Sequence, residues 1–155
     1  MKSIQTAAVI GAGVIGAGWI ARLLLNGIDV SVFDPSPDAL NNTNKVINNA
    51  ARSYANLHTA PLPKKGQLSF KGSVAEAAKD AEIVIEAVPE RLDVKQAVYN
   101  EIELSASVGT IIASSTSGIL PTDLQADLNN PERLMVAHPF NPVYLLPLVE
   151  MDGRP

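Results

Sequence analysis

The sequence contains no cysteine, few aromatic residues and no excess of positive charge. The absence of cysteine excludes disulfides, cysteine-ligated zinc and thiol chemistry, which fits a reducing compartment such as the cytoplasm. The 12 Lys and Arg residues stand against 16 Asp and Glu residues, so the chain has no basic footprint for nucleic acid or an anionic membrane. We therefore expect a cytoplasmic protein with no nucleic-acid partner, no membrane partner and no metal site.

The length and apolar content predict one globular domain over residues 1–155. Of the 155 residues, 46% are hydrophobic, which is enough to bury a core. Residues 6–25 are mostly apolar, but Arg22 and four glycines interrupt them, and no basic start or cleavage site accompanies them. This stretch is therefore not expected to be a membrane helix or a signal peptide.

Short apolar runs alternate with helical stretches, a pattern that is typical of βαβ units around a parallel sheet. We predict strands at residues 6–10, 29–33, 68–71, 82–88, 110–114, 133–137 and 145–150. We predict helices at residues 14–26, 36–54 and 91–105. A short helix is expected to begin after Ser73, its N-cap, with Glu76 as the capping-box partner, and another short helix to begin at Pro121. Ser36 is the expected N-cap of the second helix, and residues 56–66 are expected to form a surface loop. The predicted fold class is α/β, a Rossmann-type doubly wound and mostly parallel sheet.

A glycine-rich run lies between the first predicted strand and the first predicted helix. The residues expected to contact a dinucleotide there are Gly11, Ala12, Gly13, Val14, Ile15 and Gly16. In such a turn the three glycines allow the tight bend, the approach of a pyrophosphate and close helix packing, and the helix N-terminus favours the phosphates. Asp34 follows the second strand, where a carboxylate binds the ribose 2′-OH of NAD and repels the 2′-phosphate of NADP. The sequence therefore predicts NAD as the cofactor.

Four further segments resemble the 3-hydroxyacyl-CoA dehydrogenase superfamily in order and spacing. They are EAVPE at residues 86–90 with Lys95, SSTS at 114–117, HPFNP at 138–142 and LVE at 148–150. Within that superfamily, residues 54–66, 88–92, 114–124 and 137–150 are most similar to the L-carnitine dehydrogenases. Ser115 and Pro139 stand where the acyl-CoA enzymes usually have Asn and Phe, and the carnitine and L-gulonate dehydrogenases share both departures.

The chain has only two histidines, and one of them is suited to be a catalytic base. Oxidation of a secondary alcohol needs a group that takes the hydroxyl proton, and the ordinary pKa of histidine, about 6.5, lies near working pH. His58 falls in the proline-rich loop and is expected to be a surface residue. His138 falls at the C-terminal end of a predicted parallel strand, where α/β folds bind ligands. From its position alone, a hydrogen-bonded structural histidine is the better interpretation of His138.

The resemblance implies roles for the matched residues. His138 would be the general base, with Glu150 as its carboxylate partner, and Ser117 and Asn141 would hold the reacting oxygen or orient substrate and nicotinamide. Turn chemistry is the plain alternative for Ser117 and Asn141. Further cofactor contacts would come from Ala87, Glu90 and Lys95. A helix-start acid and a solvated lysine are equally good interpretations of Glu90 and Lys95.

The resemblance also implies an activity, the NAD-dependent oxidation of the 3-hydroxyl of L-carnitine to 3-dehydrocarnitine. The alternatives are L-gulonate 3-dehydrogenase, 3-hydroxyacyl-CoA dehydrogenase and a non-catalytic, structural NAD-binding protein. Phe140 and Tyr144 are candidates to face a trimethylammonium group, or they simply pack in the core. Family members carry a following helical domain with the dimer interface, which this chain would lack. We therefore expect a homodimer for the full-length protein, and a 155-residue piece that binds NAD but turns over carnitine poorly.

Overall fold

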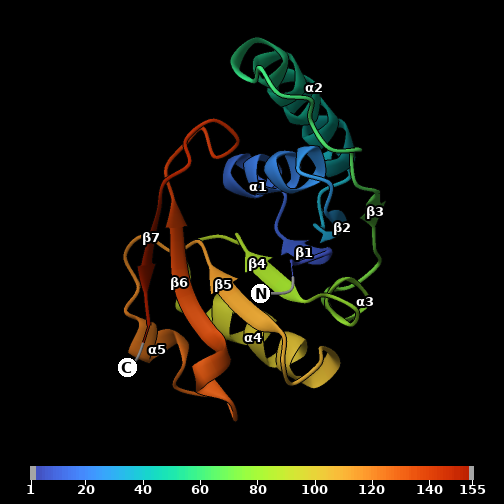
Figure 1. The fold of residues 1–155 in the computed structure, drawn as a ribbon. Helices are drawn as coiled ribbons and strands as arrows, with labels where there is room; N and C mark the ends of the chain where they lie inside the picture. The colour runs from blue at the N-terminus through green and yellow to red at the C-terminus, as the bar shows by residue number, and fades with distance from the viewer. Residues whose placement is uncertain (1–2, 154–155) are drawn as a thin grey trace.

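The computed structural model describes residues 3–153, which form a twisted seven-stranded sheet with helices on both faces (Figure 1). The strand order is β3-β2-β1-β4-β5-β6-β7, in which the first six strands are parallel and β7 runs antiparallel to β6. The predicted α/β, Rossmann-type fold is confirmed. Within residues 3–153, no helix has the length and apolar character needed to cross a membrane.

The strands are β1 (Thr6–Ile10), β2 (Asp29–Phe33), β3 (Leu68–Phe70), β4 (Ile83–Glu86), β5 (Ile111–Ser114), β6 (Leu134–Pro139) and β7 (Val149–Asp152). The helices are α1 (Val14–Leu25), α2 (Ala39–Leu57), α3 (Val74–Ala78), α4 (Leu92–Ser105) and α5 (Pro121–Leu124), with a 3-10 turn η1 at Pro131–Arg133. Apart from α2, β7 and the C-terminal ends of β4 and β6, each predicted boundary lies within one residue of the observed one.

Two hydrophobic layers sandwich the sheet. One joins α1 and α2 to the sheet through Ile20, Leu24 and Ile47, and the other joins α3 and α4 through Ala78 and Ile102, among further apolar residues. The interior strand β1 is covered from both sides, so four of its five residues are buried. Continuous apolar sequence is what a parallel strand between two helix layers requires, and it explains why the pattern located β1 correctly.

Helix α2 begins at Ala39 and ends at Leu57, so the prediction of residues 36–54 with Ser36 as N-cap is wrong. The Ser36 hydroxyl accepts the Asp38 amide and the Ser36 carbonyl accepts the Ala39 amide, which together make a turn ahead of the helix. Asp38 is the observed N-cap. The Ser36-Pro37 pair therefore belongs to a turn that precedes the helix, and Ser36 lies three residues before the first helical residue.

The last strand was also misplaced, because β7 begins at Val149 and not at residue 145. The amides of Leu145 and Leu146 both donate to the Pro142 carbonyl, so these residues form a turn after β6. Strand β4 ends at Glu86, two residues before its predicted end, because the Val88 amide bends back onto the Glu86 carboxylate. The capping box of α3 is confirmed at Ser73, which accepts the Glu76 amide, although Glu76 reaches back to the Gly72 amide.

Candidate cofactor and active site

The glycine-rich turn follows β1 and passes close to the end of β4. Gly11 has a φ of +91°, and a Cβ atom on it would lie 2.6 Å from the Ala87 carbonyl oxygen. A Cβ on Gly16 would lie 1.8 Å from the Gly11 carbonyl oxygen, so helix α1 can approach the turn only at a glycine. Gly13, by contrast, faces open space and is the N-cap of α1 without a side-chain cap. The turn therefore leaves the first turn of α1 open to an anion.

Asp34 stands directly after β2 beside this turn. Its Oδ2 accepts the Ala12 amide at 2.6 Å and its Oδ1 accepts the Ser36 amide at 2.8 Å, which fixes the carboxylate at the carboxyl edge of the sheet. A cavity of about 640 Å³ lies there, lined by Gly11, Gly13, Phe33, Asp34, Ala87 and Val88 among others. Four of the residues predicted to bind the cofactor, Gly11, Gly13, Asp34 and Ala87, therefore share one cavity. Val14 is exposed and Ile15 half-buried in the first turn of α1.

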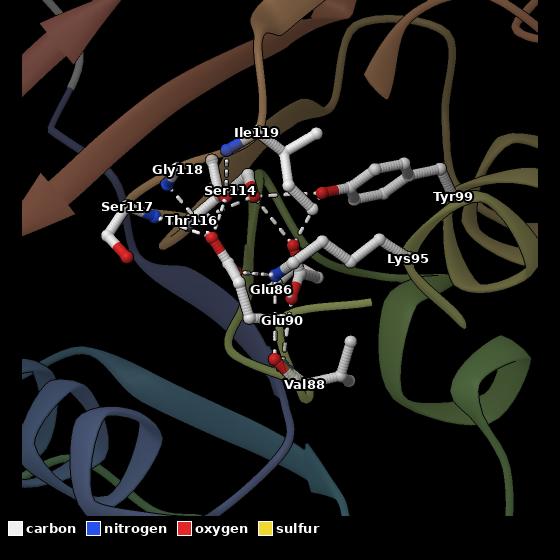
Figure 2. A network of polar contacts seen from close by, with 10 residues as sticks. All are labelled: Glu86, Val88, Glu90, Lys95, Tyr99, Ser114, Thr116, Ser117, Gly118 and Ile119. Carbon is white, nitrogen blue, oxygen red and sulfur yellow. Dashed lines mark hydrogen bonds and ion pairs between the residues drawn. The ribbon is translucent and has the colours of Figure 1, made fainter. Parts of the chain in front are cut away.

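Glu90 and Lys95 do not line this cavity, and they belong to a polar network shown in Figure 2. The Lys95 side chain is 1% exposed, and its Nζ lies 2.8 Å from Oε1 of Glu86 and 3.3 Å from Oε2 of Glu90. Tyr99 and Ser114 donate their hydroxyls to the other oxygen of Glu86. Lys95 is thus placed beneath the surface of the site, between two carboxylates.

The Glu90 carboxylate holds the loop that follows β5. Its Oε1 accepts the Thr116 hydroxyl and the amides of Ser117 and Gly118 at 2.9 and 3.0 Å. Burial raises the pKa of Glu90, but these three hydrogen bonds and the Lys95 ammonium outweigh it and lower the pKa from 4.5 to about 2. The stabilisation from ionised Glu90 is therefore complete above its ordinary pKa of 4.5, and it is lost progressively as the pH falls from there through the folded-state pKa of about 2.

His138 and Glu150 are brought together by the pairing of β6 with β7. They are opposite each other in the antiparallel register, and His138 Nδ1 lies 3.0 Å from Glu150 Oε2. The His138 side chain is 34% exposed, so the ring remains accessible. The sequence placed His138 directly after the predicted strand end at residue 137. In the structure β6 continues to Pro139, so His138 lies inside the strand.

A second cavity, of about 280 Å³, lies beside this pair. It is lined by residues 116–121 together with Val136, His138, Glu150, Met151 and Asp152. The predicted residue Ser117 is therefore brought to the same cavity as His138, whereas Asn141 is exposed and is not among the residues that line it. Phe140 lies next to His138, with ring centroids 6.2 Å apart, while Tyr144 packs against the core layer of α1 and α2.

The sequence did not predict the hydrogen-bonding role of four buried members of this network, which are Glu86, Tyr99, Ser114 and Thr116. One signal was available, because Glu86 is an acid in an otherwise apolar strand and needs partners inside the fold.

The structure places His58 at the exposed C-cap of α2 beside Tyr54. Among the residues that the structure describes, no group of three acidic or histidine side chains could hold a metal ion.

Comparison with known proteins agrees with this geometry. Residues 6–154 match the family described as the NAD-binding domain of 3-hydroxyacyl-CoA dehydrogenase. The chain is 56% identical to an L-carnitine dehydrogenase of Mesorhizobium japonicum, over 99% of this chain and 42% of that protein. It is 54% identical to an L-carnitine dehydrogenase of Oceanobacillus iheyensis, over 97% of this chain and 49% of that protein. The chain thus spans about half or less of the length of these relatives.

Solved structures show the same fold. The Escherichia coli 3-hydroxybutyryl-CoA dehydrogenase matches with a TM-score of 0.83 and 30% identity, over 97% of this chain and 32% of that one. An NAD-dependent dehydrogenase of a formyl-hydroxy-methylpyridine carboxylic acid matches with a TM-score of 0.86 and 36% identity, over 96% of this chain and 48% of that one. With its glycine turn, its Asp34 and this match over nearly its whole length, the chain belongs to the family of 3-hydroxyacyl-CoA dehydrogenase NAD-binding domains.

Proposed function

We propose that this chain is the NAD-binding part of an enzyme that oxidises the 3-hydroxyl of L-carnitine to 3-dehydrocarnitine. The observation that carries the proposal is the pairing of His138 with Glu150 at 3.0 Å beside a cavity that also contains Ser117. Two relatives more than half identical to the chain are named L-carnitine dehydrogenases, which supports this substrate over others in the family.

The residues of the glycine turn fit a dinucleotide. Gly13 has no atom within 4 Å of its Cβ position, and Asp34 places a carboxylate where a ribose hydroxyl can donate to it. Gly11, Ala12, Gly13, Val14, Ile15 and Gly16 would hold the pyrophosphate, with Asp34 and Ala87 nearer the adenosine and Glu90 nearer the nicotinamide. Lys95, being buried, would serve that end through Glu90. When bound, NAD supplies the acceptor for the hydride that leaves the alcohol carbon.

The chain's own residues handle the proton and the orientation. With its Nδ1–H donated to Glu150, the ring of His138 is fixed in the tautomer whose Nε2 can accept the hydroxyl proton. Glu150 then stabilises the imidazolium that forms. The Ser117 amide is held by Glu90 and its side chain is directed away from that carboxylate (Figure 2), so its hydroxyl is available to the reacting oxygen. Asn141 would orient the substrate from the loop after β6.

The substrate is tested by a panel of L-carnitine, L-gulonate and a 3-hydroxyacyl-CoA, assayed with NAD on a polypeptide as long as the curated relatives. Phe140 is the aromatic side chain that could face a trimethylammonium group, since Tyr144 packs against the core. Reduction of NAD with carnitine alone supports the proposal. Activity on gulonate or the thioester but not on carnitine refutes the substrate, and no activity at all favours a structural NAD-binding protein.

Asp34 is expected to set the preference for NAD over NADP. Replacing Asp34 by Asn removes the charge that repels a 2′-phosphate, so the ratio of NADP to NAD dissociation constants should fall about tenfold. The ratio can be measured by calorimetric titration of this chain. Asp38→Asn is the matched control, because Asp38 is a nearby acid at the start of α2 whose side chain makes no capping bond. An unchanged ratio in Asp34→Asn would contradict the role.

We further propose that residues 1–155 fold as a single domain, because one sheet carries both core layers. Unfolding in urea should then give one transition, with the same midpoint in the fluorescence of Trp19 and in circular dichroism. Trp19 packs against the layer of α1 and α2, while circular dichroism reports all helices. Two separate midpoints would contradict a single domain.

A cytoplasmic homodimer is the proposed state of a polypeptide as long as the relatives. The lack of cysteine supports a reducing compartment, and the family resemblance supports the dimer. Cell fractionation tests the compartment. Sedimentation equilibrium at twice the monomer mass would support the dimer, and a monomer mass would refute it.

A further inference from the structure

Five polar side chains at the carboxyl edge of the sheet are almost fully buried, and the proposed chemistry uses none of them directly. Glu86, Ser114, Tyr99, Lys95 and Thr116 are each at most 1% exposed. Burying a charge costs free energy unless the charge is paired and hydrogen-bonded, so each charged group in this cluster needs a partner in a fixed position.

Glu86 is the fixed centre of this cluster. Its Oε1 accepts Lys95 Nζ and the Val88 amide, both at 2.8 Å, and its Oε2 accepts the hydroxyls of Tyr99 and Ser114. Each carboxylate oxygen therefore has two donors. Glu86 is also the last residue of β4, where it pairs with Ser114 of β5 on one side and with Ile10 of β1, which lines the cofactor cavity, on the other.

Lys95 connects this centre to Glu90. Its ammonium lies 2.8 Å from Glu86 and 3.3 Å from Glu90, and it reaches no solvent. Glu90, in contrast, is 42% exposed. An exposed carboxylate normally samples many rotamers, but one tied to a buried ammonium is held in a single position.

The far oxygen of Glu90 holds the turn at residues 116–118, through the Thr116 hydroxyl and the two following amides. A second link reaches the same turn, because Ser114 Oγ accepts the Thr116 amide at 3.3 Å. The turn lines the cavity that contains His138. The chain of contacts in Figure 2 therefore runs from the interior of the sheet to the wall of the candidate active site.

We propose that Glu86, Tyr99 and Ser114 anchor Lys95, and that Lys95 acts through Glu90 as a positioning residue that holds the Ser117 turn against the cavity of His138. The catalytic consequence rests on the proposed function, whereas the restraint on the turn does not.

The test uses variants that break the link at Lys95. Lys95→Met alone leaves the Glu86 charge buried without its cation and can fail to fold. The double variant Glu86→Gln/Lys95→Met removes both charges together, so it should fold while Glu90 loses its partner. Asp93→Asn is the matched control, because Asp93 forms an exposed ion pair with Arg91 on the same first turn of α4 but lies outside the network.

The direct measurement is amide hydrogen exchange at Ser117 and Gly118, read by NMR on this chain. We expect exchange about tenfold faster at both amides in the double variant and no change in Asp93→Asn. The amides of Asn129 and Asn130 are an internal reference, since the carboxylate of Glu103 holds them in the same manner at 2.9 and 2.6 Å. Unchanged exchange at Ser117 and Gly118, or equal acceleration at the reference amides, overturns the proposal.

Turnover provides a second and separable reading. In a polypeptide as long as the relatives, kcat should fall about tenfold in the double variant, a larger factor than the rise in KM for NAD. The loosened turn misplaces Ser117, whereas the glycine turn that would hold the pyrophosphate is unaltered. A rise in KM for NAD with unchanged kcat overturns the positioning role. If the amides respond as expected but the unaltered protein oxidises no carnitine, the proposed function fails and the restraint on the turn stands.

Discussion

A His138→Gln enzyme is expected to lose about a thousandfold in kcat for the oxidation of L-carnitine, with KM for NAD nearly unchanged. Glutamine can still donate a hydrogen bond to Glu150, but it cannot take up the hydroxyl proton. A thousandfold corresponds to about 4 kcal/mol of lost transition-state stabilisation. The measurement is initial-rate kinetics of NAD reduction on a polypeptide as long as the curated relatives.

Glu150→Gln separates the base from its support. Glu150 takes no proton itself, but it fixes the tautomer of the His138 ring through the 3.0 Å contact, which an amide does not, so its loss should cost at least about 100-fold in kcat. His58→Gln is the control for the loss of a histidine, since His58 is exposed at the end of α2. A His138→Gln enzyme with normal kcat would show that the base lies elsewhere.

The second large effect is expected in the glycine turn, where two positions should behave differently. Gly16→Ala would put a Cβ atom 1.8 Å from the Gly11 carbonyl, so α1 must move away from β1. Forcing extra atoms into packed backbone costs about 1–3 kcal/mol or more, and both stability and NAD affinity should fall. Gly13→Ala meets no atom within 4 Å, so the fold should keep its stability while NAD affinity falls at least about tenfold.

Thermal denaturation and calorimetric titration of NAD on this chain distinguish the two glycines. Gly109→Ala is the control, because a Cβ there also meets open space and lies far along the chain from the turn. A Gly13→Ala variant that binds NAD as tightly as the unaltered chain would place the pyrophosphate somewhere other than the first turn of α1.

The elements that the sequence predicted well are those in which local pattern and burial agree. Strands β1 and β2 match residue for residue, because one is a continuous apolar run between helix layers and the other alternates cleanly. The start of α2 and the position of β7 were wrong, because in both places a turn precedes the element. The hydrogen bonds of Ser36 and Pro142 that make these turns depend on the three-dimensional path of the chain.

The candidate site was predictable only in part for a similar reason. The glycine turn and Asp34 lie close together in the sequence and follow a known spacing, so they could be identified from order alone. The contacts of Glu86 with Tyr99 and Ser114 join residues 13 and 28 positions apart on different elements. No local pattern encodes such distances, and only the buried acid itself indicated that partners had to exist.

The backbone pairing of β6 with β7, and not the loop that joins the two strands, sets the geometry of the pair formed by His138 and Glu150. Since His138 and Glu150 are cross-strand neighbours, a slip of β7 by one position would turn the acid to the opposite side of the ribbon and leave the imidazole without its companion. Substitutions in the connecting residues 140–148 that keep this pairing should therefore leave the two side chains aligned, even where they change the substrate contacts proposed for Phe140 and Asn141. Insertions there offer a route to new substrates that leaves the proton-transfer apparatus intact.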